Sequence, residues 1–223
     1  MTLLTSIIEK TGRYGFLLMS LCSMIGLKPF LDDWIESVLL SDIFFTSILI
    51  SGLYALDREP AAFHRACWLM VGIVILKMLY HVVGRMQYLH ILQLTLIILF
   101  IMQVFFMVLK HLMIEQEVTA DIVIGGACAF VLLGYIWAFA YYLLETVQPE
   151  SLKGANPLSD DPSNYVYYSF ITLTSTGYGE IVPVSQKARG LAILEAIVGQ
   201  LYLAIMVSRL VSLHISSNNA PRQ

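Results

Sequence analysis

Residues 167–180 decide the fold and read Tyr167-Tyr168-Ser169-Phe170-Ile171-Thr172-Leu173-Thr174-Ser175-Thr176-Gly177-Tyr178-Gly179-Glu180. Glycine on either side of a tyrosine permits positive backbone dihedrals that most other residues resist. Successive carbonyls can therefore point one way instead of alternating as they do in a strand. Four copies around an axis would form rings of oxygen atoms that replace the hydration shell of an ion. The Ser175 hydroxyl would add one more ring at the inner end.

The composition around this stretch is that of a polytopic membrane protein. Of the 223 residues, 58% are hydrophobic and 13% are charged, and the mean hydropathy is +0.75. A soluble domain has about 25% charged residues and about 45–50% apolar ones. These values exclude disorder, a nucleic-acid binder and an ordinary globular enzyme. The three cysteines each lie inside an apolar run without metal-ligand spacing, which favours a packing role.

Apolar runs between short polar breaks predict six membrane-spanning helices. They cover residues 14–27, 34–56, 61–83, 86–113, 119–147 and 185–214. The polar, proline-containing region 148–163 cannot be a bilayer helix, and the apolar piece 164–174 is too short to span, which makes it a re-entrant half-helix. We expect the chain to lie in the cell membrane, and the distribution of Lys and Arg favours N- and C-termini on its cytoplasmic side. Five spans would result if the first run failed to cross.

With these flanks, the stretch resembles the pore domain of the potassium channel family over residues 119–214. The family filter reads Thr-Val-Gly-Tyr-Gly, follows a pore helix ending in Thr-x-Thr and precedes Asp. The corresponding residues here are Thr172, Thr174, Ser175, Thr176, Gly177, Tyr178, Gly179 and Glu180. The resemblance implies an all-α homotetramer in which potassium ions bind at Ser175, Thr176, Gly177 and Tyr178. It divides the chain into a four-helix membrane domain (1–115), a pore domain (116–215) and a short cytoplasmic tail (216–223).

Three filter residues differ from the family pattern. Ser175 replaces Thr and loses a methyl group that helps to fix its rotamer. Thr176 replaces Val and adds a hydroxyl that needs a partner, and Glu180 replaces Asp with a longer reach. We expect potassium selectivity to survive these changes, and a weakly selective cation channel is the alternative.

Aromatic residues precede the filter at Tyr167 and Tyr168. The resemblance suggests that Tyr168 hydrogen-bonds the hydroxyl of Tyr178 and braces the filter. An interfacial aromatic belt is the other interpretation of this pair, since Tyr favours the membrane surface. Both interpretations are compatible.

The last apolar run carries a glycine and a lone acid. The resemblance places Gly199 at the family's hinge and one helical face along the inner cavity, formed by Gln200, Leu203, Val207 and Val211. Close helix packing is the alternative role for Gly199. Glu195 lies near mid-bilayer, where an acid is costly unless it is paired, protonated or hydrated. We expect it behind the filter, near the Thr172 hydroxyl or the pore-helix aromatic residues.

The first four predicted helices lack the arginine ladder of a voltage sensor, because the fourth contains no arginine. They hold two intramembrane charges, Asp42 and Lys77, at matching depths. We expect these to pair, since lone charges in a membrane are unfavourable. The alternative is that Lys77 extends its ammonium group to the interface.

Other functional classes are weighed against the channel. A secondary transporter usually has paired broken helices in two halves, whereas one re-entrant segment occurs here. A non-conducting membrane sensor that binds potassium through the pore fold is a further alternative. No enzyme activity, organic cofactor, nucleic-acid partner or soluble ligand domain is expected, and the expected partners are three more copies of the chain and membrane lipid.

Overall fold

The computed structural model describes residues 2–31, 34, 37–56, 60–84, 86–115, 119–155 and 161–218, with side chains between residues 14 and 212 except 37 and 38. Its elements are α1 (Thr2–Gly26), α2 (Lys28–Leu31), α3 (Ser37–Ala55), α4 (Pro60–Val83), α5 (Gln87–Ile114), α6 (Ala120–Val147), β1 (Leu152–Lys153), α7 (Ser163–Leu173), β2 (Val182–Pro183) and α8 (Gln186–Asn218). The long helices from α3 onward match the apolar runs to within a few residues, whereas α1 begins 12 residues before the predicted run 14–27, because the helix continues through the polar sequence before Tyr14. The helical turn α2 and the two short strands are additions to the predicted all-α fold. The tail expected at 216–223 begins inside α8, and residues 219–223 lie outside the described part of the chain.

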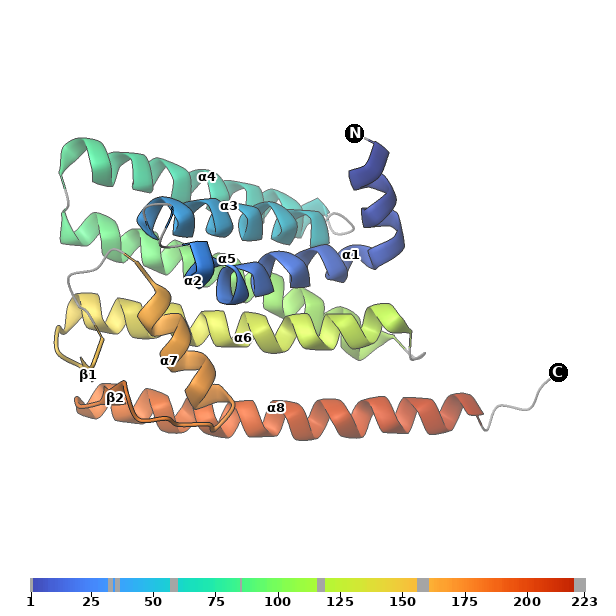
Figure 1. Cartoon of the computed structure of the whole chain (residues 1–223). Coiled ribbons are helices and arrows are strands. Elements are labelled where there is room, and N and C mark those ends of the chain that lie inside the picture. The colour runs from blue at the N-terminus through green and yellow to red at the C-terminus, as the bar shows by residue number, and fades with distance from the viewer. Residues whose placement is uncertain are drawn as a thin grey trace.

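The long helices run side by side, with α5 packed between α4 and α6 and with α1 against α3 and α6. Both termini lie at one end of the bundle, and β1 and β2 lie at the other (Figure 1). The short helix α7 crosses obliquely beside α6 and α8. The filter stretch therefore lies between the two helices that flank it in sequence.

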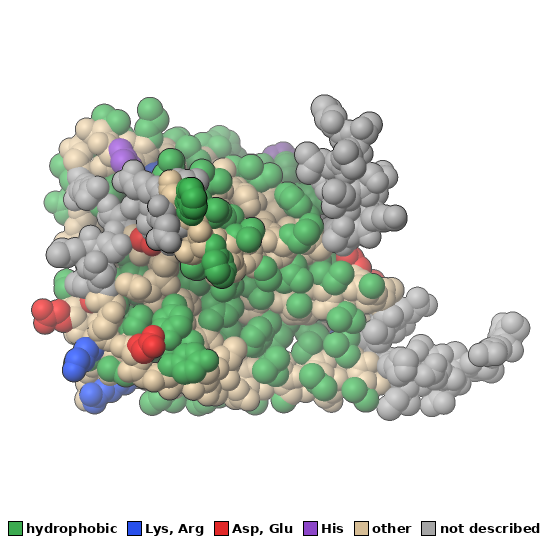
Figure 2. Space-filling view, viewed as in Figure 1, with side chains coloured by type: hydrophobic (Ala, Val, Ile, Leu, Met, Phe, Trp, Pro, Cys, Tyr) green, Lys and Arg blue, Asp and Glu red, His purple; other side chains and the backbone are tan. Residues whose placement is uncertain are grey.

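Four of the described helices are long and apolar enough to cross a bilayer. They are Pro60–Val83, Gln87–Ile114, Ala120–Val147 and Gln186–Ser212. The described stretches Tyr14–Gly26 and Leu39–Ala55 are apolar but shorter than the ~20 residues that a typical span needs. Figure 2 shows apolar side chains over most of the visible face, with most visible charged ones toward the end that carries β1 and β2. The molecule therefore has the surface of a membrane-spanning protein.

At the end of the bundle that holds the termini, Arg209 joins α8 to α5. Its guanidinium donates hydrogen bonds to the carbonyl oxygens of Leu112, Met113 and Glu115, at 2.7 to 3.1 Å. The last carbonyls of a helix have no partner within the helix, and a cation at this end also interacts favourably with the negative end of the helix dipole. This contact links the C-terminus of the four-helix part to the last helix.

At the opposite end, β1 and β2 join the segments before and after α7. Leu152 pairs with Pro183 and Lys153 with Val182 in antiparallel register. Gly154 has a φ of +92°, and a Cβ at this position would overlap the carbonyl oxygen of Glu180. Glycine is required there both by the backbone dihedral and by the close approach. The segment that follows residues 174–180 is thus held against the loop that precedes α7.

Candidate functional site

The helix α7 positions the site. Its 11 residues extend ~16 Å at 1.5 Å per residue, which is about half of a bilayer core of ~30 Å. It approaches α6 closely, because a Cβ on Gly134 would lie 2.5 Å from the ring of Phe170. Tyr165, Tyr168, Ser169 and Leu173 are buried. The C-terminal end of α7 is therefore fixed in depth by packing on its neighbours.

The backbone turns at the end of α7 so that successive amides point back toward the helix. The amide of Ser175 donates to the carbonyl of Thr172 at 2.9 Å, and those of Thr176 and Gly177 both donate to Ile171 O, at 2.9 and 3.1 Å. The described peptide bonds are all trans, and in a trans peptide the carbonyl points opposite to the N–H of the same unit. The three carbonyls of these peptide units therefore point away from α7, all on one side of the chain.

The backbone dihedrals explain how the amides converge. Ser175, Gly177 and Gly179 have positive φ values of +57°, +56° and +84°. Alternation between right- and left-handed residues makes a concave nest of N–H groups, which here holds the carbonyl oxygen of Ile171. The two glycines match the sequence pattern, whereas a non-glycine residue at positive φ costs about 1–2 kcal/mol and the sequence gives no signal of it. The Ser175 hydroxyl accepts a 3.1 Å hydrogen bond from the Gln200 amide, which helps to hold this residue in place.

The threonine hydroxyls are turned away from the one-sided carbonyls. Thr174 Oγ1 lies 2.7 Å from Phe170 O and 2.9 Å from Thr176 Oγ1, so the additional hydroxyl at Thr176 has a partner. Thr172 Oγ1 donates to Tyr168 O at 2.8 Å within the same helix. The hydroxyls of Thr174 and Thr176 thus help to hold the turn at the end of α7 in place.

Glu195 lies behind the turn and is completely buried. Tyr141 donates to Glu195 Oε2 at 2.6 Å, and Ser169 Oγ lies 2.5 Å from Glu195 Oε1 and 2.7 Å from Gly134 O. Ser169 has one hydroxyl proton, and a carbonyl only accepts. Both contacts of Ser169 are hydrogen bonds when Glu195 is the protonated acid and donates to Ser169. Ser169 and Tyr141 are thus its hydrogen-bond partners. Of the two expected neighbours, the Thr172 hydroxyl is occupied within its own helix, whereas the pore-helix aromatic Tyr168 packs against Tyr141 beside the acid.

The two tyrosines before the filter have different surroundings. Tyr167 donates to Glu180 Oε2 at 2.8 Å and links α7 to the end of the filter. Tyr168 is 3% exposed and packs edge-on against Tyr141, with ring centroids 4.8 Å apart. The hydrogen bond expected between Tyr168 and Tyr178 does not occur within the described residues of one chain, where Tyr178 is 71% exposed.

Gly199 contacts the end of α7 directly. A Cβ there would overlap the carbonyl oxygen of Leu173 and lie 2.9 Å from Leu173 Cδ1. This contact supports the packing role among the two alternatives for Gly199. On the same helix, Leu203, Val207 and Val211 are exposed in the single chain.

Comparison with known proteins identifies the same part of the chain. A family model described as "Ion channel" matches residues 129–215. No curated protein and no solved structure matches the chain. The matched range contains α7, the one-sided carbonyls and most of α8, so the ion-channel match coincides with the geometry described above.

Outside the matched residues 129–215, the structure brings Asp42 and Lys77 together. Lys77 Nζ donates to Asp42 Oδ1, and both side chains are about one third exposed, at 33% for Lys77 and 36% for Asp42. The pair joins α3 to α4. An intramembrane lysine thus has its counterion within the same four-helix part.

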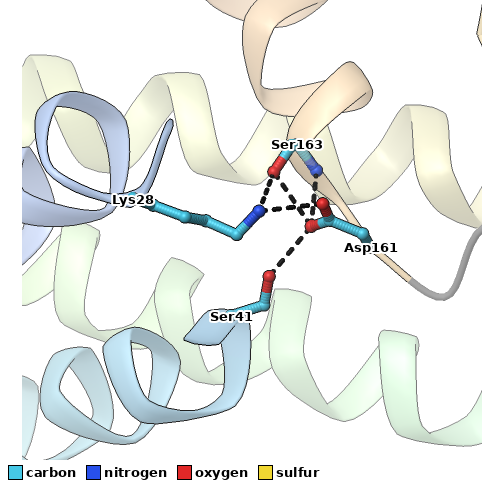
Figure 3. A network of polar contacts seen from close by, with 4 residues as sticks. All are labelled: Lys28, Ser41, Asp161 and Ser163. Carbon is cyan, nitrogen blue, oxygen red and sulfur yellow. Dashed lines mark hydrogen bonds and ion pairs between the residues drawn. The ribbon is translucent and has the colours of Figure 1, made fainter. Parts of the chain in front are cut away.

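A second ion pair, which sequence reasoning missed, connects the four-helix part to α7. Lys28 is 1% exposed, and its Nζ lies 2.8 Å from Asp161 Oδ2 and 2.5 Å from Ser163 Oγ. The other oxygen of Asp161 accepts from Ser41 Oγ at 2.8 Å and from the Ser163 amide at 3.2 Å (Figure 3). A carboxylate that accepts an amide of the first turn stabilises a helix N-terminus. This network therefore holds the start of α7.

Lys28→Met is expected to destabilise the protein by about 3–5 kcal/mol, because it leaves Asp161 as an uncompensated, largely buried charge. Thermal unfolding of the purified protein in detergent measures the effect. The double variant Lys28→Met with Asp161→Asn removes both charges and should recover most of the loss. An equal loss in both variants would contradict a role of the ion pair itself.

Glu195→Ala is expected to lower the stability by about 1–3 kcal/mol, because the buried Tyr141 hydroxyl loses its acceptor. Glu195→Gln is the matched control, since its amide donates to Ser169 and accepts from Tyr141 without any charge. The unfolding temperature of Glu195→Gln should be close to that of the parent protein, and that of Glu195→Ala should be well below it. If Gln is as damaging as Ala, a charged carboxylate is required and the protonated form is wrong.

Proposed function

We propose that the chain is one subunit of a potassium-selective channel and that Ser175, Thr176, Gly177, Tyr178 and Gly179 form its filter. One observation carries this proposal: the amides of residues 175–177 donate to the end of α7, so that the carbonyls of Thr174, Ser175 and Thr176 face the opposite side together. The positive φ values of Gly177 and Gly179 continue the same irregular backbone through the rest of the stretch. Backbone carbonyls arranged in this way replace the hydration shell of potassium in selective pores. The ion-channel match over residues 129–215 supports the coarser part of this proposal, ion conduction, and the potassium selectivity rests on the filter residues.

The proposed channel is a homotetramer, because a single chain supplies one wall of such a filter. Residues 174–180 are all exposed in the single chain, and so is the α8 face of Leu203, Val207 and Val211. A membrane protein covers such surfaces with other copies or with lipid. Fourfold packing would place the carbonyls around one axis, with the α8 faces along the cavity below them.

Six spans with α7 as a re-entrant helix are the topology that we propose. The apolar stretches Tyr14–Gly26 and Leu39–Ala55 pack in the same bundle as the four longer spans. Both termini lie at one end of the bundle (Figure 1), as an even number of crossings requires. The distribution of Lys and Arg favours the cytoplasm of the cell for that end.

A weakly selective cation channel is the second candidate. The Gln200 amide donates to Ser175 Oγ at 3.1 Å, so an ion at the inner ring would compete with it for that oxygen. This competition affects a single ring. The carbonyl rings that discriminate between the ions lie beyond it, which favours the selective function.

Ion flux into liposomes that contain the purified chain tests the proposal. We expect flux under a potassium gradient and little under an equal sodium gradient. Comparable sodium flux would support the weakly selective channel. Absence of both fluxes would favour the non-conducting sensor and would contradict the proposed function.

A further inference from the structure

A cavity of about 500 Å³ lies within the four-helix part, outside the filter. It is lined by α3, α4 and α5 together with the outer part of α6 and the residue that precedes α7. Its size falls within the range of about 300–1,000 Å³ that is typical of small-molecule sites. The ion pair of Asp42 and Lys77 lies in its wall.

The polarity of the cavity changes along the helices. Asp42 lies five residues after the start of α3 and Lys77 six residues before the end of α4, which places both within about 10 Å of the helix ends. Tyr80, His81 and His90 line the same polar end. The wall farther from these ends is apolar and includes Leu49, Ile73, Leu94 and Ile97. A polar end near the membrane surface and an apolar wall below it match the polarity of a lipid molecule.

The cavity reaches the apolar outer surface of the bundle. Two of its lining residues on α4, Val74 and Met78, are exposed by 54% and 69%. Ile43 and Ile50 on the neighbouring helix α3 are exposed as well. An acyl chain can therefore pass from the cavity into the surrounding membrane between these helices.

We propose that this cavity binds a membrane phospholipid whose headgroup carries a primary ammonium. The pair of Asp42 and Lys77 has no net charge, but it presents an acceptor and a donor side by side. Among the described residues, Asp42 is the hydrogen-bond acceptor of Lys77, and an ammonium has three donors, so that others can reach a phosphate. The lipid's own ammonium then donates to Asp42. Charge-assisted hydrogen bonds of this kind are the strong ones.

The bound headgroup lies next to the residues that hold the start of α7. Ser41 lines the cavity and donates to Asp161, which binds Lys28. Pro162, the N-cap residue of α7, also lines the cavity. The lipid therefore supports the position of the pore helix from the four-helix side, and this second part rests on the proposed function.

Native mass spectrometry of the delipidated full chain tests the binding. The probes are phosphatidylethanolamine, phosphatidylglycerol and phosphatidylcholine with identical acyl chains, since only the first has both a phosphate and N–H donors on an ammonium. We expect phosphatidylethanolamine to bind roughly tenfold more tightly than phosphatidylcholine, the effect of losing a hydrogen bond to a charged group. Equal binding of these two lipids would overturn the proposal.

Val74→Trp, with Ile75→Trp as its control, tests the place of binding, and Asp42→Asn tests the contact with the headgroup. Val74→Trp fills the cavity from its exposed rim and should abolish the tight binding, whereas Ile75→Trp, exposed on the same helix outside the cavity lining, should leave it unchanged. Asp42→Asn should remove the preference for phosphatidylethanolamine over phosphatidylcholine. Gel filtration checks that each variant keeps the parent's oligomeric state. Unchanged binding in Val74→Trp would overturn the site.

Flux in liposomes of varied lipid composition tests the effect on the pore separately. We expect potassium flux of the parent and of Ile75→Trp to rise with phosphatidylethanolamine content and that of Val74→Trp to be insensitive to it. Tight binding with flux independent of this lipid would overturn the coupling to α7 alone. Tight binding without any flux would contradict the proposed function and leave the lipid site standing.

Discussion

Liposomes that contain the Gly177→Asp variant are expected to show no potassium flux above the protein-free background. Gly177 has a φ of +56°, and its amide belongs to the nest around Ile171 O. Asp tolerates the left-handed conformation better than most residues, so the chain should still fold. The added carboxylate, repeated in four copies, would however lie among the carbonyls of the filter and bind the ions that should pass.

Gly84→Asp is the matched control for this variant. Gly84 also has a positive φ, +105°, and nothing lies within 4 Å of the position of its Cβ, but it lies between α4 and α5. The backbone strain in Gly84→Asp is at least as large, because a φ of +105° lies outside the left-handed region of about +50 to +70° that Gly177 occupies, and the place is different. Flux should persist in Gly84→Asp; a loss in both variants, or flux in Gly177→Asp, would contradict the assignment of the filter.

Local sequence patterns were sufficient for most of the long helices and for the positive φ values of Gly177 and Gly179. A long apolar run is enough to predict a helix in lipid, and a glycine is enough to predict that a positive φ is permitted. Both features can therefore be inferred without knowledge of the neighbouring residues. The positive φ of Ser175 could not be inferred from the sequence, because it depends on the nest of amides around Ile171 O and on the hydrogen bond from the Gln200 amide. Tertiary contacts overcome the preference of a residue that would otherwise avoid this conformation.

Pairings between distant residues divide in the same way. Asp42 and Lys77 could be paired from sequence because each was the lone charge at a similar depth in adjacent spans. Lys28 and Asp161 lie 133 positions apart and fall in predicted connections between the apolar runs, where a charge needs no partner and the sequence therefore gives no signal of a pairing. Glu195 indicated a buried polar site, because it is an acid within an apolar run. Its partner Tyr141 is one of many tyrosines in the sequence, so only the packing of α6 against α7 and α8 shows which tyrosine binds Glu195.

Gly199→Ala is expected to displace the end of α7 and to reduce potassium flux strongly. The added Cβ would overlap the carbonyl oxygen of Leu173, and backbone cannot rotate away as a flexible side chain can. Overpacking of this kind typically costs about 1–3 kcal/mol, against a gain in helix propensity of about 1 kcal/mol. Leu173 lies two residues before Ser175, so a shift of its carbonyl moves the inner ring of the filter.

Gly190→Ala on the same helix separates this effect from helix propensity. Nothing lies within 4 Å of the position of a Cβ on Gly190, so this variant gains the propensity of alanine without the overlap. Thermal unfolding and flux should both be at least as high as in the parent. If Gly199 were instead a hinge, alanine would stiffen α8 and alter the opening of the pore, but the unfolding temperature would rise as it does for Gly190→Ala. A lower unfolding temperature together with a loss of flux identifies the contact with Leu173 as the reason for the glycine, because bending freedom alone does not require space for a neighbouring carbonyl.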